Sequence, residues 1–326
     1  MTDLRAPWPA PYAIDPALPA ALPRDGRPAI VTVGTFDGVH RGHWEVLAEI
    51  GRRARRTGGR SILVTFHPHP LRIVRPEFAP PLLTTPAEKR ELLADSGLEY
   101  VVFVPFTRTL QQYPARRFVE EILLGRIHMD ELVIGYDHGF GKDREGTVDT
   151  LRDVGRELGF GVDVVEAFQV DGQPVASSRI RALIAEGDVA AAAPLLGRCY
   201  SLEGVVVQGE RKGRELGFPT ANIEVGDPDK MLPKEGIYAV FGRVGGERLP
   251  GLLHLGPRPT FAGFAPTVEL WLIDFEGDLY GQRVRVELVQ RLRDIHPFTT
   301  VDALVAAMKE DERVGREILA SSNGES

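Results

Sequence analysis

Cysteine is nearly absent: the 326-residue chain has Cys199 alone, so it cannot form an internal disulfide. This fits a protein of the reducing cytoplasm, where we expect it to work. No hydrophobic run approaches the roughly 20 residues that a membrane-spanning helix needs. Excess positive charge is also missing, because 39 Lys and Arg residues face 46 Asp and Glu residues, for a net charge of −7. This balance provides no broad basic surface, so we expect neither nucleic acid nor a membrane as a partner.

The first 28 residues lack a continuous apolar segment, because seven prolines interrupt them. We therefore expect no secretory signal there. Residues 1–24 have the composition of a weakly ordered N-terminal arm.

Short β-type and helical stretches alternate from Ala29 to about Gly187. The expected strands are 29–33, 61–66, 100–104, 131–134 and 162–166. The expected helices are 42–57, 86–96, 114–124 and 147–158. This alternation predicts a parallel, doubly wound, Rossmann-like α/β sheet, whose ligands bind beyond the carboxyl ends of the strands.

The pattern changes near Cys199, after an alanine-rich helical stretch at 188–196. The next β-type runs have no helices between them and cover 202–208, 220–225, 237–244, 249–255, 267–275 and 283–292. They predict an antiparallel β-barrel or sandwich, followed by a terminal helix over about 301–320. We expect one domain at 25–187, a linker helix region at 188–199 and a second domain at 200–326.

The stretch GTFDGVHRGH, residues 34–43, follows the first expected strand and opens the first expected helix. Its three glycines and the unpaired N–H groups of a helix start suit a phosphate. His40 and His43 are three residues apart, a spacing that projects both side chains to one side. Two imidazoles facing a phosphate would stabilise charge that develops in a transition state. A zinc half-site would also accommodate His-x-x-His, but the chain has one cysteine and the intervening Arg41-Gly42 is unfavourable beside a cation. Two solvated histidines on a loop would leave the three glycines unexplained.

Three further segments follow expected strand ends or open a helix. Phe66-His67-Pro68-His69-Pro70 is a stiff loop with an aromatic ring and hydrogen-bond donors, although a plain surface turn fits it nearly as well. The segment 135–146 combines glycines with basic residues that suit phosphate, and its Asp137 could accept hydrogen bonds from a ring or a ribityl group. In the segment 175–181, the two serines either only cap a helix or also bind a triphosphate together with Arg181.

The segment 209–222 is the most informative one in the second half of the chain. Its glycines and basic residues predict a flap that closes over polyphosphate, or else a basic hairpin that binds nothing. Thr220 and Asn222 are two residues apart, so on a strand they share a face. A hydroxyl and an amide oxygen on that face could hold Mg²⁺ against phosphates.

Residues 34–43 resemble the HxGH signature of the nucleotidylyltransferase superfamily, in the form found in prokaryotic bifunctional riboflavin kinase/FMN adenylyltransferases (FAD synthetases). The segments 66–70, 135–146 and 175–181 resemble the F-x-P-H-P, G-x-D/N-F-x-F-G and S-S-T-x-I/V-R motifs of the same family. The segment 209–222 resembles the riboflavin kinase signature G-x-x-x-G-R-x-L-G-F-P-T-A-N. The R-P-T-F, V-E and L-D-F-x-G-D-L-Y-G motifs follow it in order. The resemblance spans roughly residues 29–319.

The resemblance implies a role for individual residues. Glu269 would be the general base of the kinase reaction, and His40, His43 and Arg181 would be the catalytic residues of the adenylyltransferase reaction. The implied nucleotide-binding residues are Gly34, Phe36, Asp37, Gly38, Gly42, Ser177, Ser178, Gly209, Lys212, Gly213, Arg214, Thr220 and Asn222. The implied flavin-binding residues are Phe66, His67, Pro68, Asp137 and Phe140, and the implied Mg²⁺ ligands are Thr220 and Asn222. The chain departs from the family pattern at His138, Ala176, His254, Pro257, Trp271 and Ile295.

The resemblance also implies two reactions. The second domain would phosphorylate riboflavin to FMN with ATP, and the first would adenylylate FMN to FAD with another ATP, releasing pyrophosphate. One alternative is a riboflavin kinase with an inactive first domain. Another is a flavin- or nucleotide-binding regulator without turnover. The expected partners are these small molecules, and the sequence leaves a homo-oligomer open.

Overall fold

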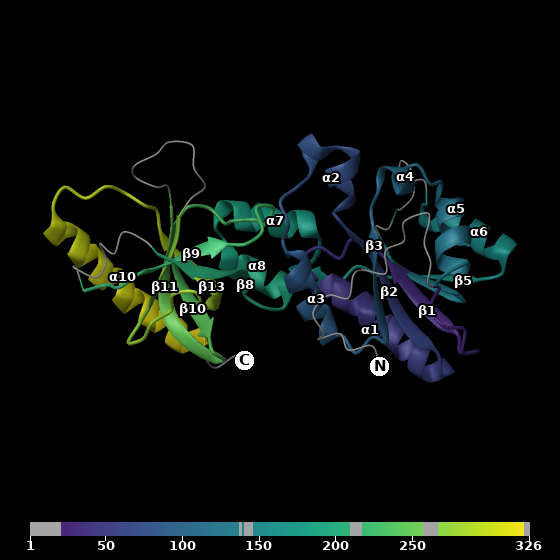
Figure 1. Cartoon of the computed structure of the whole chain (residues 1–326), viewed down its shortest axis with the longest axis horizontal. Helices are drawn as coiled ribbons and strands as arrows, with labels where there is room; N and C mark the ends of the chain where they lie inside the picture. Colours follow the sequence, from purple (N-terminus) through teal and green to yellow (C-terminus); the bar gives the residue numbers. More distant parts are fainter. Residues whose placement is uncertain (1–20, 137–138, 140–145, 209–216, 257–266, 323–326) are drawn as a thin grey trace. The chain divides into compact units, whose positions relative to one another are not determined.

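The structure is a computed structural model that describes residues 21–136, 139, 146–208, 217–256 and 267–322. The chain divides into two compact units, Met1–Ser177 and Ser178–Ser326 (Figure 1). Within the described residues, no helix is long and apolar enough to cross a membrane.

The N-terminal unit is built on a five-stranded parallel sheet in the order β3-β2-β1-β4-β5. Its strands are β1 (Ala29–Val33), β2 (Arg60–His67), β3 (Tyr100–Pro105), β4 (Glu131–Gly135) and β5 (Gly161–Val165). After β1, the chain adds β2 and β3 on one side of that strand and then crosses to add β4 and β5 on its other side. The parallel, doubly wound sheet predicted from the alternation is confirmed, and β1 marks the switch point where such sheets bind ligands.

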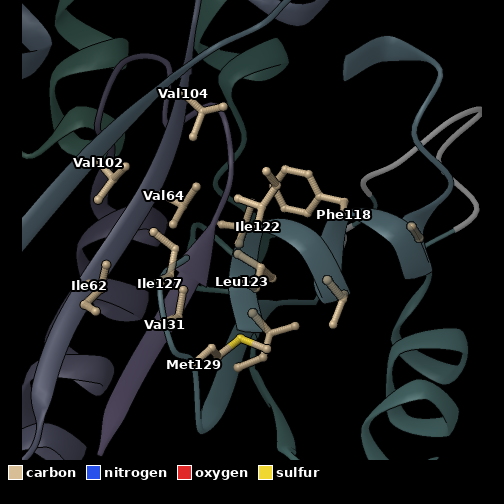
Figure 2. Close-up of a cluster of buried hydrophobic side chains, with 14 of the residues drawn as sticks. Val31, Ile62, Val64, Val102, Val104, Phe118, Ile122, Leu123, Ile127 and Met129 are labelled. Atoms are coloured by element: carbon tan, nitrogen blue, oxygen red, sulfur yellow. The ribbon is translucent and has the colours of Figure 1, made fainter. Parts of the chain in front are cut away.

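Neighbouring side chains of β1 point to opposite faces of this sheet. Ile30 packs with α1 (Arg41–Thr57) and α3 (Pro86–Ala94), whereas Val31 packs with α5 (Ala115–Phe118), η2 (Val119–Leu124) and α6 (Val148–Leu158). Figure 2 shows the second cluster, which joins strand residues such as Val31 and Val64 to Phe118 of α5 and Ile122 of η2. Both faces are covered, so the central strands β1 and β4 carry buried apolar residues on both sides.

Several short elements of this unit differ from the sequence expectation. The helix expected over 114–124 consists of one α-turn, α5, followed by the π-helical η2. The unpredicted elements are α2 (Pro70–Val74), η1 (Pro76–Phe78), α4 (Arg108–Gln111), β6 (Gln169–Val170) and β7 (Gln173–Pro174). Each has five residues or fewer, which is too short for a periodic pattern. Residues 1–20 of the expected arm lie outside the described residues, and Leu22 is buried, with its N–H donating to the Arg126 carbonyl.

The boundary between the two units falls at the first residue of α7 (Ser177–Glu186). The C-terminal unit continues with α8 (Val189–Leu196) and a closed barrel. The barrel strands are β8 (Tyr200–Val207), β9 (Ala221–Val225), β10 (Gly236–Val244), β11 (Glu247–Gly256), β12 (Thr267–Leu272) and β13 (Arg283–Arg293). Neighbouring strands are antiparallel, in the order β10-β11-β12-β9-β8-β13. Of the two architectures that the sequence predicted, the structure shows the barrel and not the sandwich.

The outside of the barrel is divided between a covered and an uncovered part. The terminal helix α10 (Val301–Ser322) packs on β10, β11 and β13 from outside, with Leu319 against Ala239 and Phe241 (Figure 1). Along β12, Val268 and Leu270 are buried while Glu269 and Trp271 are partly exposed. Glu269 therefore projects from the barrel on a strand that α10 leaves accessible.

Candidate active sites

The segment between β1 and α1 has an unusual backbone. Phe36, Gly38 and Val39 all have positive φ angles, of 48°, 84° and 37°. Such conformations are costly for Phe and Val, so the surrounding structure must hold them. Gly34 allows the turn, because a Cβ there would stand 3.0 Å from the Phe36 ring. The loop ends at His40, where α1 begins.

His40 and His43 cap α1 reciprocally. The His43 N–H donates to Nδ1 of His40, and the His40 N–H donates to Nδ1 of His43, at 3.3 Å in each case. The two rings stack with their centroids 3.6 Å apart, and the Phe36 ring lies 4.5 Å from that of His43. Because both Nδ1 atoms accept hydrogen bonds, a neutral ring carries its proton on Nε2. The predicted pair is thus brought together with defined tautomers at a helix N-terminus, where the dipole favours an anion.

The Asp37 carboxylate lies beneath this loop and is 1% exposed. It accepts hydrogen bonds from the backbone N–H groups of Leu83 and Thr84 at 3.1 Å, and from the Thr84 hydroxyl at 3.2 Å. The same hydroxyl accepts the Gly38 N–H at 3.0 Å. Asp37 was expected to bind nucleotide, but these contacts favour a role in holding the loop over direct contact with a ligand.

The segment 168–177, which ends at the first residue of α7, approaches the same loop. The Ser177 hydroxyl donates to the Asp37 carbonyl at 2.9 Å, and the Arg41 guanidinium lies 4.5 Å from the centre of the Phe168 ring. A Cβ at Gly42 would stand 3.5 Å from the Val175 carbonyl. The structure thus places Ser177 beside the segment 34–40 between β1 and α1, which we call the histidine loop. Ser178 and Arg181 lie further along α7, in the C-terminal unit.

Sequence reasoning missed Lys89, on α3. Its ammonium group is buried and donates to the Thr35 carbonyl at 2.6 Å. Burial lowers the pKa of Lys89 to about 8, against the opposing effect of the Asp37 carboxylate. No sequence signal distinguishes this lysine from the neighbouring Arg90, because α3 has no clear polar and apolar faces in the sequence.

The flavin-binding candidates are placed differently from one another. Phe66 is 7% exposed, and its ring packs 5.6 Å from Phe106 and 6.0 Å from Phe118 in the core. This favours a role in supporting the following loop over stacking on a flavin. His67 is exposed, Pro68 follows it through a cis peptide bond, and His69 caps α2. Asp137 and Phe140 lie outside the described residues.

A row of polar side chains crosses three neighbouring strands of the barrel. Asn222 on β9 pairs with Glu269 on β12, which in turn pairs with His254 on β11. Directly opposed residues of antiparallel strands share a face, so the three side chains line one surface. The Thr220 hydroxyl donates to the Glu269 carboxylate at 3.5 Å. The predicted base and both predicted Mg²⁺ ligands are therefore brought together.

His254 adds an imidazole to this row. Its Nδ1 is buried and has no hydrogen-bond partner among the described residues. Burial lowers the pKa of His254, and the Glu269 carboxylate opposes that shift. Phe218, beside Thr220, packs edge-on against Trp271 with ring centroids 4.8 Å apart, at the other side of Glu269.

Two parts of the expected kinase site lie outside the described residues. These are the flap candidates Gly209, Lys212, Gly213 and Arg214, and the segment that contains Pro257. Within the described part of the chain, no group of three or more His, Cys, Asp or Glu side chains could hold a metal ion. The Thr220 hydroxyl and the Asn222 amide offer oxygen ligands instead, which suit Mg²⁺ shared with phosphates.

A histidine loop at the switch point of a doubly wound sheet, joined to a barrel with a Thr-Asn-Glu surface, defines a two-domain nucleotide-dependent transferase. Residues 22–179 match the family model described as FAD synthetase, and residues 196–319 match the one described as riboflavin kinase. The chain belongs to the family of bifunctional riboflavin kinase/FMN adenylyltransferases.

Relatives match over nearly the whole chain. The bifunctional riboflavin kinase/FMN adenylyltransferase of Escherichia coli K12 is 35% identical over 90% of this chain and 93% of its own length. The Pseudomonas fluorescens protein of the same name is 36% identical over 91% and 94%. A crystal structure described as a macrolide-efflux protein from Streptococcus pneumoniae has a TM-score of 0.83 and 29% identity, covering 91% of this chain and 95% of that one.

Proposed function

We infer that this chain converts riboflavin to FMN in its C-terminal unit and FMN to FAD in its N-terminal unit, with ATP as the donor in both reactions. Family membership over both units supports this function. The observation that carries it is the presence of two separate polar sites: the stacked His40–His43 pair at the start of α1, and Glu269 between Asn222 and His254 on the barrel. Neither of the two alternatives accounts for both sites. A riboflavin kinase alone does not need the His40–His43 site, and a non-catalytic regulator does not need a general base such as Glu269.

For the kinase reaction, we propose that Glu269 takes the proton of the riboflavin 5′-hydroxyl. The oxygen of that hydroxyl then forms a bond to the γ-phosphorus of ATP as the bond to the β,γ-bridging oxygen breaks, which releases ADP. The Thr220 hydroxyl and the Asn222 amide oxygen would hold Mg²⁺ against the ATP phosphates, where the ion supplies charge neutralisation. The hydrogen bond from Thr220 to Glu269 orients the carboxylate toward the same place.

For the adenylyltransferase reaction, we propose that the FMN phosphate attacks the α-phosphorus of ATP directly and that pyrophosphate leaves. FMN phosphate is already a nucleophile, so the protein needs no side-chain nucleophile. Nε2–H of His40 and Nε2–H of His43 would donate to the phosphate oxygens as charge builds on them. The backbone N–H groups at the start of α1 add to this anion site, and Arg181 is proposed to orient the triphosphate.

The remaining assignments are proposals of the same kind. Residues 25–187 would form the adenylyltransferase domain and 200–326 the kinase domain. Ser177, Ser178, Gly34, Gly38 and Gly42 would line the nucleotide site, and His67 and Pro68 would contact the flavin. Because both reactions consume ATP, we propose that the enzyme works in the cytoplasm.

A chromatographic time course with riboflavin, ATP and Mg²⁺ tests the proposal. The wild-type chain should form FMN first and FAD after it. The doubly substituted His40→Ala/His43→Ala chain should still form FMN but no FAD. Accumulation of FMN without FAD in the wild type would support the kinase-only alternative, and absence of both products would support a regulator.

A further inference from the structure

Two buried residues of opposite charge, Lys89 and Asp37, hold the histidine loop in place. Lys89 is 8% exposed and Asp37 is 1% exposed, and the field of the Asp37 carboxylate acts on the Lys89 ammonium. Both side chains anchor the same short segment. Lys89 donates to the carbonyl of Thr35, and the Asp37 carboxylate, two residues further along the loop, accepts the N–H groups of Leu83 and Thr84. Removing charges from water is costly, so a buried lysine at this place calls for an explanation.

The Thr35 carbonyl alone does not require a lysine. The buried Thr65 hydroxyl donates to the same carbonyl oxygen at 3.1 Å, so a neutral donor already satisfies it. Asp37 is likewise satisfied by three donors from Leu83 and Thr84. What Lys89 adds is a positive charge that balances the Asp37 carboxylate.

That balance matters for an anionic ligand. Without Lys89, the loop would lose a positive charge that offsets the negative charge of the Asp37 carboxylate. A triphosphate held at the loop and at the start of α1 would then face a like charge through a poorly polarisable interior, where repulsion is stronger than in water. We propose that Lys89 is a positioning residue of the adenylyltransferase site, which holds the Thr35 carbonyl and neutralises Asp37 so that the loop accepts the triphosphate of ATP. This inference rests on the proposed function of the N-terminal unit.

The test compares Lys89→Met with Thr65→Val. The first substitution removes the charge and one donor to the Thr35 carbonyl at nearly constant volume, and the second removes only the neutral donor to the same atom. FAD formation is measured with FMN supplied and ATP varied, and FMN formation from riboflavin in the same preparation controls for the integrity of the chain. Lys89→Met should raise KM for ATP in FAD formation by about tenfold or more, a larger effect than on kcat. Thr65→Val should change that KM by less than about threefold, and neither substitution should alter FMN formation.

Equal effects of the two substitutions on KM, or a Lys89→Met chain with the wild-type KM, would overturn the proposal. If Lys89→Met leaves the N-terminal unit unfolded, the wild type decides. Its kcat/KM for ATP in FAD formation should fall as the pH rises above about 8, where Lys89 loses its proton. FMN formation by the same chain should not follow that fall, and a flat FAD profile up to high pH would refute the role of Lys89. A wild-type chain that forms no FAD at all would instead refute the proposed function itself.

Discussion

The rings of His40 and His43 stack 3.6 Å apart while each residue caps the backbone of the other. The same pair therefore ends a strained loop, starts α1 and presents two Nε2 atoms at the helix N-terminus. A substitution of either histidine changes helix capping and phosphate contact together. These two contributions can be separated by the choice of the replacing residue.

His40→Asn should separate them. An asparagine side chain caps a helix well, because its oxygen accepts a backbone N–H, but it cannot replace Nε2–H of the imidazole. Thermal unfolding should therefore show little loss of stability for His40→Asn and a loss of about 1 kcal/mol for His40→Ala. FAD formation should fall by about a hundredfold or more in both. Near wild-type FAD formation by His40→Asn would show that the imidazole acts only as a cap.

Thr84→Val tests the anchoring of the loop. The Thr84 hydroxyl donates to Asp37 and accepts the Gly38 N–H, and valine does neither. A buried N–H without a partner costs about 1–3 kcal/mol, so the unfolding free energy of the N-terminal unit should fall by that amount. FAD formation should fall with it while FMN formation persists. Thr150→Val, on the surface of α6, is the control and should change neither. Unchanged stability in Thr84→Val would mean that the loop is held by other contacts.

Glu269→Gln tests the proposed base of the kinase reaction. Glutamine keeps the size of the side chain but cannot take a proton, so FMN formation should fall by about 10²- to 10⁴-fold. FAD formation from supplied FMN should be unaffected, because it uses the other unit. Glu224→Gln, which changes an exposed carboxylate further along β9, is the matched control. Equal FMN formation by Glu269→Gln and wild type would exclude Glu269 as the base.

The docking of α10 depends on a bidentate ion pair between Arg293 and Asp311. The two hydrogen bonds are 2.8 and 2.7 Å long, and the side chains are 23% and 10% exposed. Asp311→Asn leaves the guanidinium without its counter-charge, which should lower the free energy of unfolding by roughly 2–3 kcal/mol, less than for a fully buried pair. Glu310→Gln breaks an exposed pair with Arg313 on the same helix and should leave the melting temperature unchanged. Similar melting temperatures for the two variants would contradict this difference.

The fold was largely predictable because its strands are apolar, β-branched runs separated by clear helical stretches. The predicted strand over 29–33 coincides with β1, whereas the π-helical η2 has no signal that distinguishes it from an α-helix. The choice between barrel and sandwich needed strand pairing, since both architectures have the same alternation along each strand.

The site candidates were predictable only where they are close together in the sequence. His40 and His43 form one helical turn, so their spacing places them together. Thr84 and Lys89, by contrast, reach the histidine loop from 46 and 54 residues away. His254 and Glu269 become neighbours only through the register of β11 and β12. Local spacing contains no information on such contacts, and for the same reason the burial of Phe66 and Asp37 could not be foreseen.

His254 should make the stability of the C-terminal unit sensitive to acid. Burial lowers the pKa of its imidazole in the folded chain below the ordinary value of 6.5. The unfolded chain then binds a proton more readily than the folded one, so stability is fully present above pH 6.5 and is lost as the pH falls toward the lowered pKa. The measurement is thermal unfolding of the wild type and of His254→Gln between about pH 7.5 and pH 5.5.

His254→Gln cannot take up a proton, so its melting temperature should fall less than that of the wild type over this pH range. His296→Gln removes an exposed imidazole from the same unit and is the control for the loss of a ring. The Glu269 carboxylate attracts a protonated His254, so Glu269→Gln should lower the pKa of His254 further and steepen the acid dependence of stability. Parallel melting curves for the wild type and His254→Gln across the pH series would mean that the folded and unfolded chains bind the His254 proton equally well.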